Sequence, residues 1–281
     1  MDENRRAYSL KAPGPTGSGP SVHLPGRGSF PGIDDRLVVP EVTRDEIIGG
    51  RRVIAFPAQP AHATKQSDLD YVLRAHVAPG YTAAADLITR HDEESDFASD
   101  ACIFKQGIDP ETGARYLEEI AFEVVSEQTE RNVREKVPRM NRRGVRRIFA
   151  IFLKAQQVCE WSSESRTWRP LDAGSRIEDP CLVAPLAVAA LLDAAAADNA
   201  VVAALVAKDN PAIREREATA EARGEVKGRA ESVLQVLAAR GVAVSAAQRQ
   251  AILGCYDLDR LSRWLIRAAV ASSSDEITAE P

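Results

Sequence analysis

The segment IAFEVVS, residues 120–126, is a short apolar run with one carboxylate, Glu123, near its centre. Its β-branched and aromatic residues predict a strand, and its near-continuous hydrophobicity predicts that the strand is buried. An ionised carboxylate in such a place needs a cation or several hydrogen-bond donors beside it, because isolated burial would force it to take up a proton. Glu123 therefore indicates a functional site, unless this face of the sheet is open to water.

Helix and strand signals flank this segment in both directions. Apolar residues recur at helical spacing in two segments, and Gly144 is a stop signal for the second. The predicted order is a helix at 62–78, strands at 81–89, 97–105 and 117–126, a helix at 128–144 and a strand at 145–154. A meander followed by a strand-helix-strand crossover predicts an α/β protein with a mixed sheet flanked by helices.

Composition divides the chain into three predicted parts. Residues 1–40 are rich in Gly and Pro without hydrophobic periodicity, which predicts a disordered leader. Residues 41–193 form the predicted α/β domain, with added β-hairpins around Gly49-Gly50 and within 158–171. Residues 194–281 are rich in helix formers, which predicts an all-helical C-terminal region made of a long charged helix and a small helical hairpin.

The overall composition limits the class of protein. Of the 281 residues, 44% are apolar and 27% charged, and no apolar run approaches the roughly 20 residues that span a bilayer. The first residues also lack the apolar stretch of a secretory signal, so we expect a cytoplasmic protein without a membrane anchor. The four cysteines form no CxxC pair and are interpreted as small apolar fillers. The net charge of -5 argues against a protein that coats nucleic acid over its whole surface.

A second acid, Asp100, precedes the apolar residues of the neighbouring predicted strand. Two acids on adjacent strands can converge on one divalent ion, and Mg²⁺ is typically held by one or two protein carboxylates together with a substrate phosphate. Alternatively, Asp100 is a surface acid at the start of its strand. The sequence thus offers Asp100 and Glu123 as a candidate pair of metal ligands.

Positive charge is concentrated directly after the Glu123 strand. Between 131 and 147 there are eight basic residues against a single acid, Glu135. Such a cluster is typical of a phosphate-binding surface, although a charge run also occurs on solvated helix faces. The candidates for nucleic-acid contact are Arg131, Arg134, Arg139, Arg142 and Arg143.

These residues carry a resemblance to a known family. Ser99-Asp100, the stretch 122–126, Lys136 and the Arg143-Gly144-Val145 turn are similar to the motifs of the PD-(D/E)XK nuclease superfamily. Within it, they most resemble the Uma-type "putative restriction endonuclease" family, over residues 43–193. The resemblance implies a restriction-endonuclease-like core of helix-strand-strand-strand-helix-strand order, the order that the periodicity predicts here.

The resemblance also implies an activity and a site. It implies hydrolysis of nucleic-acid phosphodiester bonds, with DNA as the expected substrate and Mg²⁺, or else Mn²⁺, as the cofactor. Asp100 and Glu123 would bind the metal ion, and Lys136 would orient the attacking water or stabilise the transition state. Glu46 resembles an N-terminal acid of the family and would complete the site.

The sequence departs from the superfamily pattern at the position of the lysine. The pattern places a lysine two residues after the glutamate, where this chain has Val125. Lys136 is the replacement that resembles the family branch, but Pro138 could break its helix and leave it on a loop. Lys105, on the Asp100 strand, is the alternative donor.

Two classes of function follow. The first is a metal-dependent endonuclease; the second is a catalytically inactive nuclease-like fold that binds nucleic acid or a protein. Retention of Asp100, Glu123 and a nearby lysine favours the enzyme, because an inactive copy has no reason to keep an uncompensated buried charge. The C-terminal helices are expected to serve self-association as a homodimer, or contact with another partner, although a structural cap is the alternative.

Overall fold

The computed structural model describes residues 31–34, 45–54, 59–126 and 129–278. The chain divides into two compact units, one up to Ala207 and one from Lys208 onward. Most of the predicted disordered leader, 1–40, lies outside the described residues. Its described part, 31–34, packs against the first unit, where Ile33 is buried and accepts a backbone hydrogen bond from Arg90.

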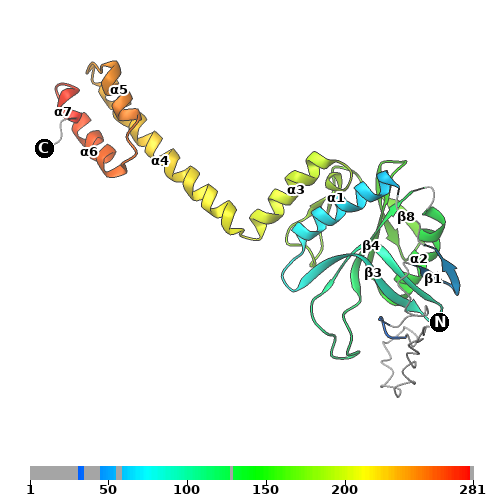
Figure 1. The fold of residues 1–281 in the computed structure, drawn as a ribbon. Coiled ribbons are helices and arrows are strands. Elements are labelled where there is room, and N and C mark those ends of the chain that lie inside the picture. The colour runs from blue at the N-terminus through cyan, green and yellow to red at the C-terminus, as the bar shows by residue number, and fades with distance from the viewer. Residues whose placement is uncertain (1–30, 35–44, 55–58, 127–128, 279–281) are drawn as a thin grey trace, which may run out of the picture. The chain divides into compact units, whose positions relative to one another are not determined.

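The first unit is built on one mixed sheet, which confirms the predicted fold class (Figure 1). The order of its strands is β2-β1-β4-β5-β6-β7-β8, and β3 pairs with the other side of β4. β5 and β6 are parallel, as the crossover through a helix requires, and the remaining pairs are antiparallel. The strands are β1 (Glu46–Ile48), β2 (Arg51–Val53), β3 (Tyr81–Asp92), β4 (Ser95–Lys105), β5 (Glu118–Val125), β6 (Arg147–Phe152), β7 (Gln157–Ser162) and β8 (Thr167–Pro170).

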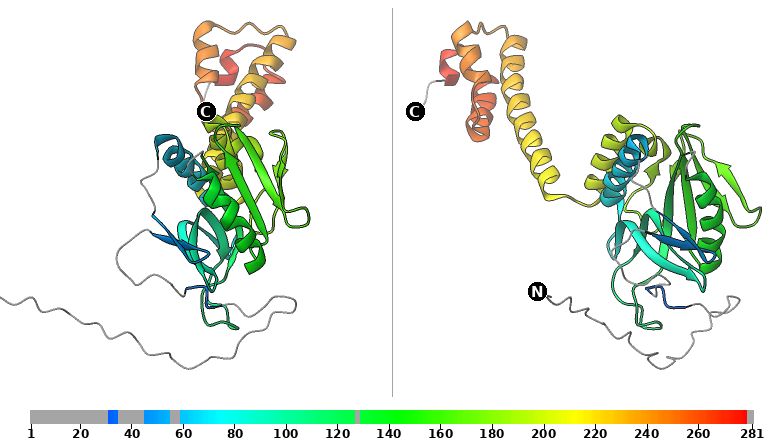
Figure 2. Two further views of the ribbon diagram at one scale, coloured as in Figure 1. Left: turned by 90° about the vertical axis from the view of Figure 1, so that its right-hand side faces the viewer. Right: turned by 45° about the vertical axis from the view of Figure 1, so that its right-hand side comes forward.

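Helices cover both faces of this sheet (Figure 2). On one face, α1 (Pro60–His76) shares a core with the side chains of β4, β5 and β6 that alternate inward, among them Ile103, Phe122 and Phe149, and α3 (Ala194–Ala207) packs against α1 in that core. On the other face, α2 (Glu130–Arg143) packs through its apolar stripe of Val133, Val137 and Met140. Since both faces are covered, every residue of the central strand β5 except Glu119 is buried, as its composition predicts.

The helix α2 continues through Pro138, and therefore Lys136 lies on a helix and not on a loop. The helix ends at Gly144, whose backbone has a φ of 122° and donates a hydrogen bond to Met140. The predicted glycine stop is confirmed, because this conformation is costly for residues with a Cβ atom. The hairpin between β1 and β2 likewise turns at Gly49 and Gly50, both with positive φ.

The helix α3 belongs to the first unit, which moves the boundary between the units from the expected position after 193 to after Ala207. One face of α3, formed by Ala197, Ala200, Val201 and Ala204, is buried in the same core as α1, whereas Val202 and Val206 are exposed. It follows the short strands β9 (Arg176–Ile177) and β10 (Leu186–Ala187) and the 3-10 helix η1 (Val188–Leu191). The helix has no polar face to mark which side is buried, so its sequence did not show to which unit it belongs.

The second unit is all-helical and has its own core. It comprises α4 (Pro211–Ala239), α5 (Ala246–Leu253), α6 (Leu258–Ala268) and α7 (Asp275–Thr278). The second half of α4 packs against α5 and α6 through Leu237, Ile252 and Trp264, among others. The chain thus has the predicted long helix and helical hairpin. No helix of the described ranges is both long and apolar enough to cross a membrane.

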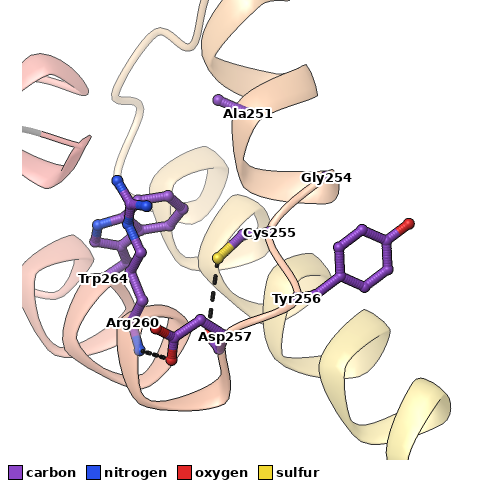
Figure 3. Close-up of a pocket in the computed structure, with 7 residues that line it drawn as sticks. All are labelled: Ala251, Gly254, Cys255, Tyr256, Asp257, Arg260 and Trp264. Carbon is purple, nitrogen blue, oxygen red and sulfur yellow. Dashed lines mark hydrogen bonds between the residues drawn. The ribbon is translucent and has the colours of Figure 1, made fainter.

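A shallow pocket of about 500 Å³ lies in this unit between the end of α5 and α6 (Figure 3). Two of its polar residues have structural contacts: Asp257 caps α6 by accepting a hydrogen bond from Arg260 N, and the Arg260 guanidinium lies 4.9 Å from the Trp264 ring centroid. These contacts stabilise the start of α6. The acidic residues predicted to be functional all lie in the first unit.

Candidate active site

The site lies where strand β4 changes its neighbour. One edge of β4 pairs with β3, while the other pairs with β1 at Asp96 and with β5 from Ala101 onward. Within the described strands, the intervening residues 97–100 have no ladder partner on that second edge. Backbone groups in such a gap must find other hydrogen-bond partners, because buried backbone groups are rarely left unpaired.

Two predicted side chains supply such partners at Ala98, and a third bonds to the backbone of β5. Glu46 accepts a hydrogen bond from Ala98 N at 2.9 Å, and Lys136 Nζ donates one to Ala98 O at 2.8 Å. Lys136 Nζ also lies 2.8 Å from Glu46 Oε1. The Asp100 carboxylate accepts a hydrogen bond from Val124 N of β5 at 2.6 Å. These contacts bring β1, β4, β5 and α2 together at the gap.

Glu123 is the most enclosed acid of this group, with 2% of its surface exposed. The β4–β5 register pairs Ala101 with Phe122, so Asp100 and Glu123 are the next positions on the two strands. Its Oε1 atom is buried without a hydrogen-bond partner in the described part of the chain. Burial, together with the negative charges of Asp100 and Glu46, raises the pKa of Glu123 well above its ordinary value, although Lys136 opposes the shift.

Lys136 is the cation of the site. It is buried, and its Nζ atom lies 5.4 Å from the centroid of the Phe97 ring. Burial would lower its pKa, but the carboxylates of Glu123 and Glu46 outweigh that effect and raise the pKa to about 12. The alternative donor, Lys105, is exposed at the end of β4 and lies over the Tyr116 ring. The structure therefore places Lys136, and not Lys105, beside the acids.

Close to the site lie further acids, which sequence reasoning missed. Gln66 of α1 donates hydrogen bonds to Asp86 Oδ1 and to Asp100 O. Burial and the charges of Asp86 and Asp100 raise the pKa of Asp70 to about 6. Gln66 and Asp70 are four residues apart and therefore lie on the same face of α1. For Asp86, the available signal was an acid inside the predicted strand sequence YTAAADLIT. Their proximity makes the site strongly acidic, with Lys136 as its central cation.

Two buried histidines of the first unit lie near the site. His91 is buried in β3, where it stacks on Phe97 with ring centroids 4.1 Å apart. Burial and nearby cations lower the pKa of His91 well below its ordinary value. His62 lies in the first turn of α1, with Nε2 3.5 Å from Asp100 Oδ2. This contact raises the pKa of His62, against the effect of burial.

The arginines predicted to contact nucleic acid have unequal roles. Arg139 is bound to Ser95 Oγ and pairs with Asp92, and Arg143 donates to Pro31 O, so both hold the fold together. The side chains of the other three, Arg131, Arg134 and Arg142, are 80%, 73% and 63% exposed, although each has an acidic neighbour within 4 Å. Of the five arginines, these three expose most of their side chains to solvent.

The site fits a divalent ion held by two protein carboxylates. The described residues contain no group of three or more His, Cys, Asp or Glu side chains arranged as a metal cage. Mg²⁺ seldom uses such a cage and is usually bound by one or two carboxylates, water and substrate phosphate. The unpartnered carboxylate oxygen of Glu123, next to Asp100, is the kind of group that such an ion would satisfy.

The mixed sheet and this acidic site define a restriction-endonuclease-like protein. Residues 35–192 match the model of the Uma2 family, described as "Putative restriction endonuclease", and the chain belongs to that family. The resemblance found in the sequence is thereby confirmed, and the chain is classed with nucleases.

The crystal structure of a "putative nuclease belonging to DUF820" from Anabaena variabilis ATCC 29413 is similar over 53% of this chain and 89% of that chain. The two sequences are 17% identical, and the TM-score is 0.44. No curated protein matches the chain.

Proposed function

We propose that this protein is a Mg²⁺-dependent endonuclease that hydrolyses the phosphodiester bonds of nucleic acid, with DNA as its substrate. The observation that carries the proposal is the buried, unpartnered Glu123 carboxylate beside Asp100 and Lys136. A fold that served only to bind would be more stable with an apolar residue at this position, because burying an unmatched carboxylate is costly. Family membership supports the class of reaction.

In this proposal Asp100 and Glu123 hold Mg²⁺, and Mn²⁺ can replace it. The bound ion supplies Lewis-acid stabilisation of the phosphate charge and lowers the pKa of a water molecule. Lys136 Nζ donates a hydrogen bond to the attacking water or to the phosphate oxygen on which charge develops. Glu46 and Ala98 O hold Lys136 in place, since both are 2.8 Å from its Nζ atom.

The exposed arginines Arg131, Arg134 and Arg142 contact the phosphate backbone away from the cleaved bond. Each would exchange its carboxylate neighbour for a phosphate, at a small cost because exposed ion pairs contribute little. The free thiols of Cys102, Cys159, Cys181 and Cys255 are consistent with a reducing cytoplasm as the site of action. The helical second unit would serve self-association or contact with a partner.

A cleavage assay tests the proposal. Supercoiled plasmid is incubated with the full chain and Mg²⁺ or Mn²⁺, with EDTA as a blank, and nicked and linear products are measured. We expect metal-dependent cleavage that Glu123→Gln abolishes and that Glu119→Gln retains. Glu119 is a matched control because it lies on the same strand and forms a surface ion pair with Arg146.

The same assay can refute the enzyme. DNA binding by a folded wild-type chain that never cuts, with either metal ion and with both plasmid and single-stranded DNA, would contradict the proposal. That result would support the inactive nuclease-like binding module.

A further inference from the structure

His62 is a buried imidazole beside the proposed metal ligand Asp100. It lies in the first turn of α1, and about 10% of its side chain is exposed. Its Nε2 atom is 3.5 Å from Asp100 Oδ2, at the outer limit of a hydrogen bond. Neither ring nitrogen has a well-formed partner among the described residues, which is uncommon for a buried polar group.

The other histidine of α1 provides a contrast. His76, at the far end of the helix, is also buried, and its Nδ1 atom lies 2.8 Å from Val72 O. A backbone partner one turn away explains why that position tolerates an imidazole. His62 has no equivalent local partner in the described structure, and what its ring faces is the carboxylate of Asp100.

The contacts of Asp100 suggest what His62 does. Val124 N donates to Oδ2 at 2.6 Å, and His62 Nε2 approaches the same oxygen. Two donors on Oδ2 would fix the rotation of the carboxylate and leave Oδ1 as the oxygen for a ligand. Groups that orient a metal-binding side chain in this way change metal affinity although they never touch the metal ion.

We propose that His62 is a positioning residue of the site, which holds the Asp100 carboxylate through an Nε2–H hydrogen bond. The inference rests on the proposed function, because it assigns Asp100 the role of a metal ligand. His62 then contributes to the affinity for the divalent ion and not to the chemical step. Loss of such an orienting partner typically costs 10–100-fold in metal affinity or activity.

Two variants separate the hydrogen bond from the space that the ring fills. His62→Phe keeps a buried ring but removes the donor, whereas His62→Gln keeps a donor. His76→Gln is the control on the same helix. Binding of Mn²⁺ to each full-length variant is measured by titration calorimetry, and cleavage is measured as a function of Mn²⁺ concentration. Circular dichroism and thermal melting establish that each variant is folded.

We expect His62→Phe to weaken Mn²⁺ binding about 10-fold or more. Its cleavage rate should recover at saturating Mn²⁺, and His62→Gln and His76→Gln should remain within about 3-fold of wild type. Equal Mn²⁺ affinity of wild type and His62→Phe would overturn the positioning role while the proposed function stands. A wild-type chain that takes up no Mn²⁺ would overturn both. If His62→Phe does not fold, His62→Gln is the deciding variant. A 10-fold loss of Mn²⁺ affinity in His62→Gln would then refute a positioning role that any hydrogen-bond donor can fill.

Discussion

Asp179 and Glu123 are both enclosed acids of the first unit, one beside two arginines and the other beside a single lysine. The Asp179 side chain is 1% exposed and accepts hydrogen bonds from Arg146, Arg147 and the backbone of Cys181. Burial alone would raise its pKa, but hydrogen bonds from Arg146 and the Cys181 backbone outweigh burial and lower it. Arg146 and Arg147 also pair with Glu119 and Glu160, so the whole cluster is matched.

For Glu123 the effect of burial is larger than the effect of nearby cations. The hydrogen bonds of its nearest cation, Lys136, go to Glu46 and Ala98 instead, and the pKa of Glu123 is raised. A cluster in which every charged side chain is paired stabilises the fold and leaves no group free to bind a ligand. An unmatched one destabilises the isolated protein and gains when a cation arrives. The difference distinguishes a structural from a functional group of charges.

The largest effect is expected from Lys136→Met. Removing one partner of a buried charge network leaves Glu46, Glu123 and Ala98 O without their cation, which costs about 3–5 kcal/mol in comparable cases. Urea unfolding measures the loss, and cleavage should disappear as well. A variant of unchanged stability would show that the acids of this site are neutral without the lysine. The contrast between this site and the paired cluster at Asp179 would then fail.

Asp179→Asn should destabilise the protein by about 1.5–3 kcal/mol, the range for hydrogen bonds to charged groups. The side chains of Arg146 and Arg147 are 43% and 21% exposed, and water will replace part of what they lose. Cleavage per folded molecule should remain that of the wild type. A variant that folds normally but no longer cuts would contradict the structural role assigned to this cluster.

Glu123→Gln should change how stability depends on pH in the absence of divalent ions. The folded pKa of Glu123 lies above its unfolded value, near 4.5, so the folded state retains a proton that the unfolded state releases. Stability contributed by this group is therefore complete below about pH 4 and falls as the pH rises toward the folded pKa, by at most about 1.4 kcal/mol per unit.

Thermal melts between pH 4.5 and 7.5 in EDTA measure this dependence. Relative to wild type, Glu123→Gln should gain stability as the pH rises. Asp179 has the opposite sign, because its pKa is lowered, and its contribution should fade below about pH 4. Parallel curves for wild type and Glu123→Gln would show that Glu123 is ionised and well paired after all.

The smallest effect is expected for Arg131→Gln. If Arg131 contacts one phosphate, its loss should weaken DNA binding a few-fold and reduce the slope of log affinity against log salt concentration by about 0.9. Fluorescence anisotropy at several salt concentrations measures the slope. Arg169→Gln on β8 is the control, since Arg169 is also exposed and paired with a single acid. An identical slope for both variants would remove Arg131 from the DNA-binding surface.

Local patterns in the sequence were sufficient for the order of the core elements and for the pair Asp100 and Glu123. Periodicity identified α1, α2 and β3 to β6, and burial of a carboxylate singled out Glu123. Pairing of charges across the fold was not predictable, because the partners are distant in the chain. Arg146 and Asp179 are 33 residues apart, so a run of eight basic residues overstated the free positive charge. Gln66 and Asp86 were missed for the same reason.

The gap in β4 has a consequence for how an inactive form of this protein can arise. Glu46 and Lys136 complete the hydrogen bonding of Ala98, so they act as substitutes for a missing stretch of sheet as well as members of the site. A change at either residue would loosen the junction of β1, β4 and β5 together with any activity. Evolution or design of a stable, non-cutting descendant should therefore begin at Glu123, whose loss removes an electrostatic burden and leaves the strand junction intact.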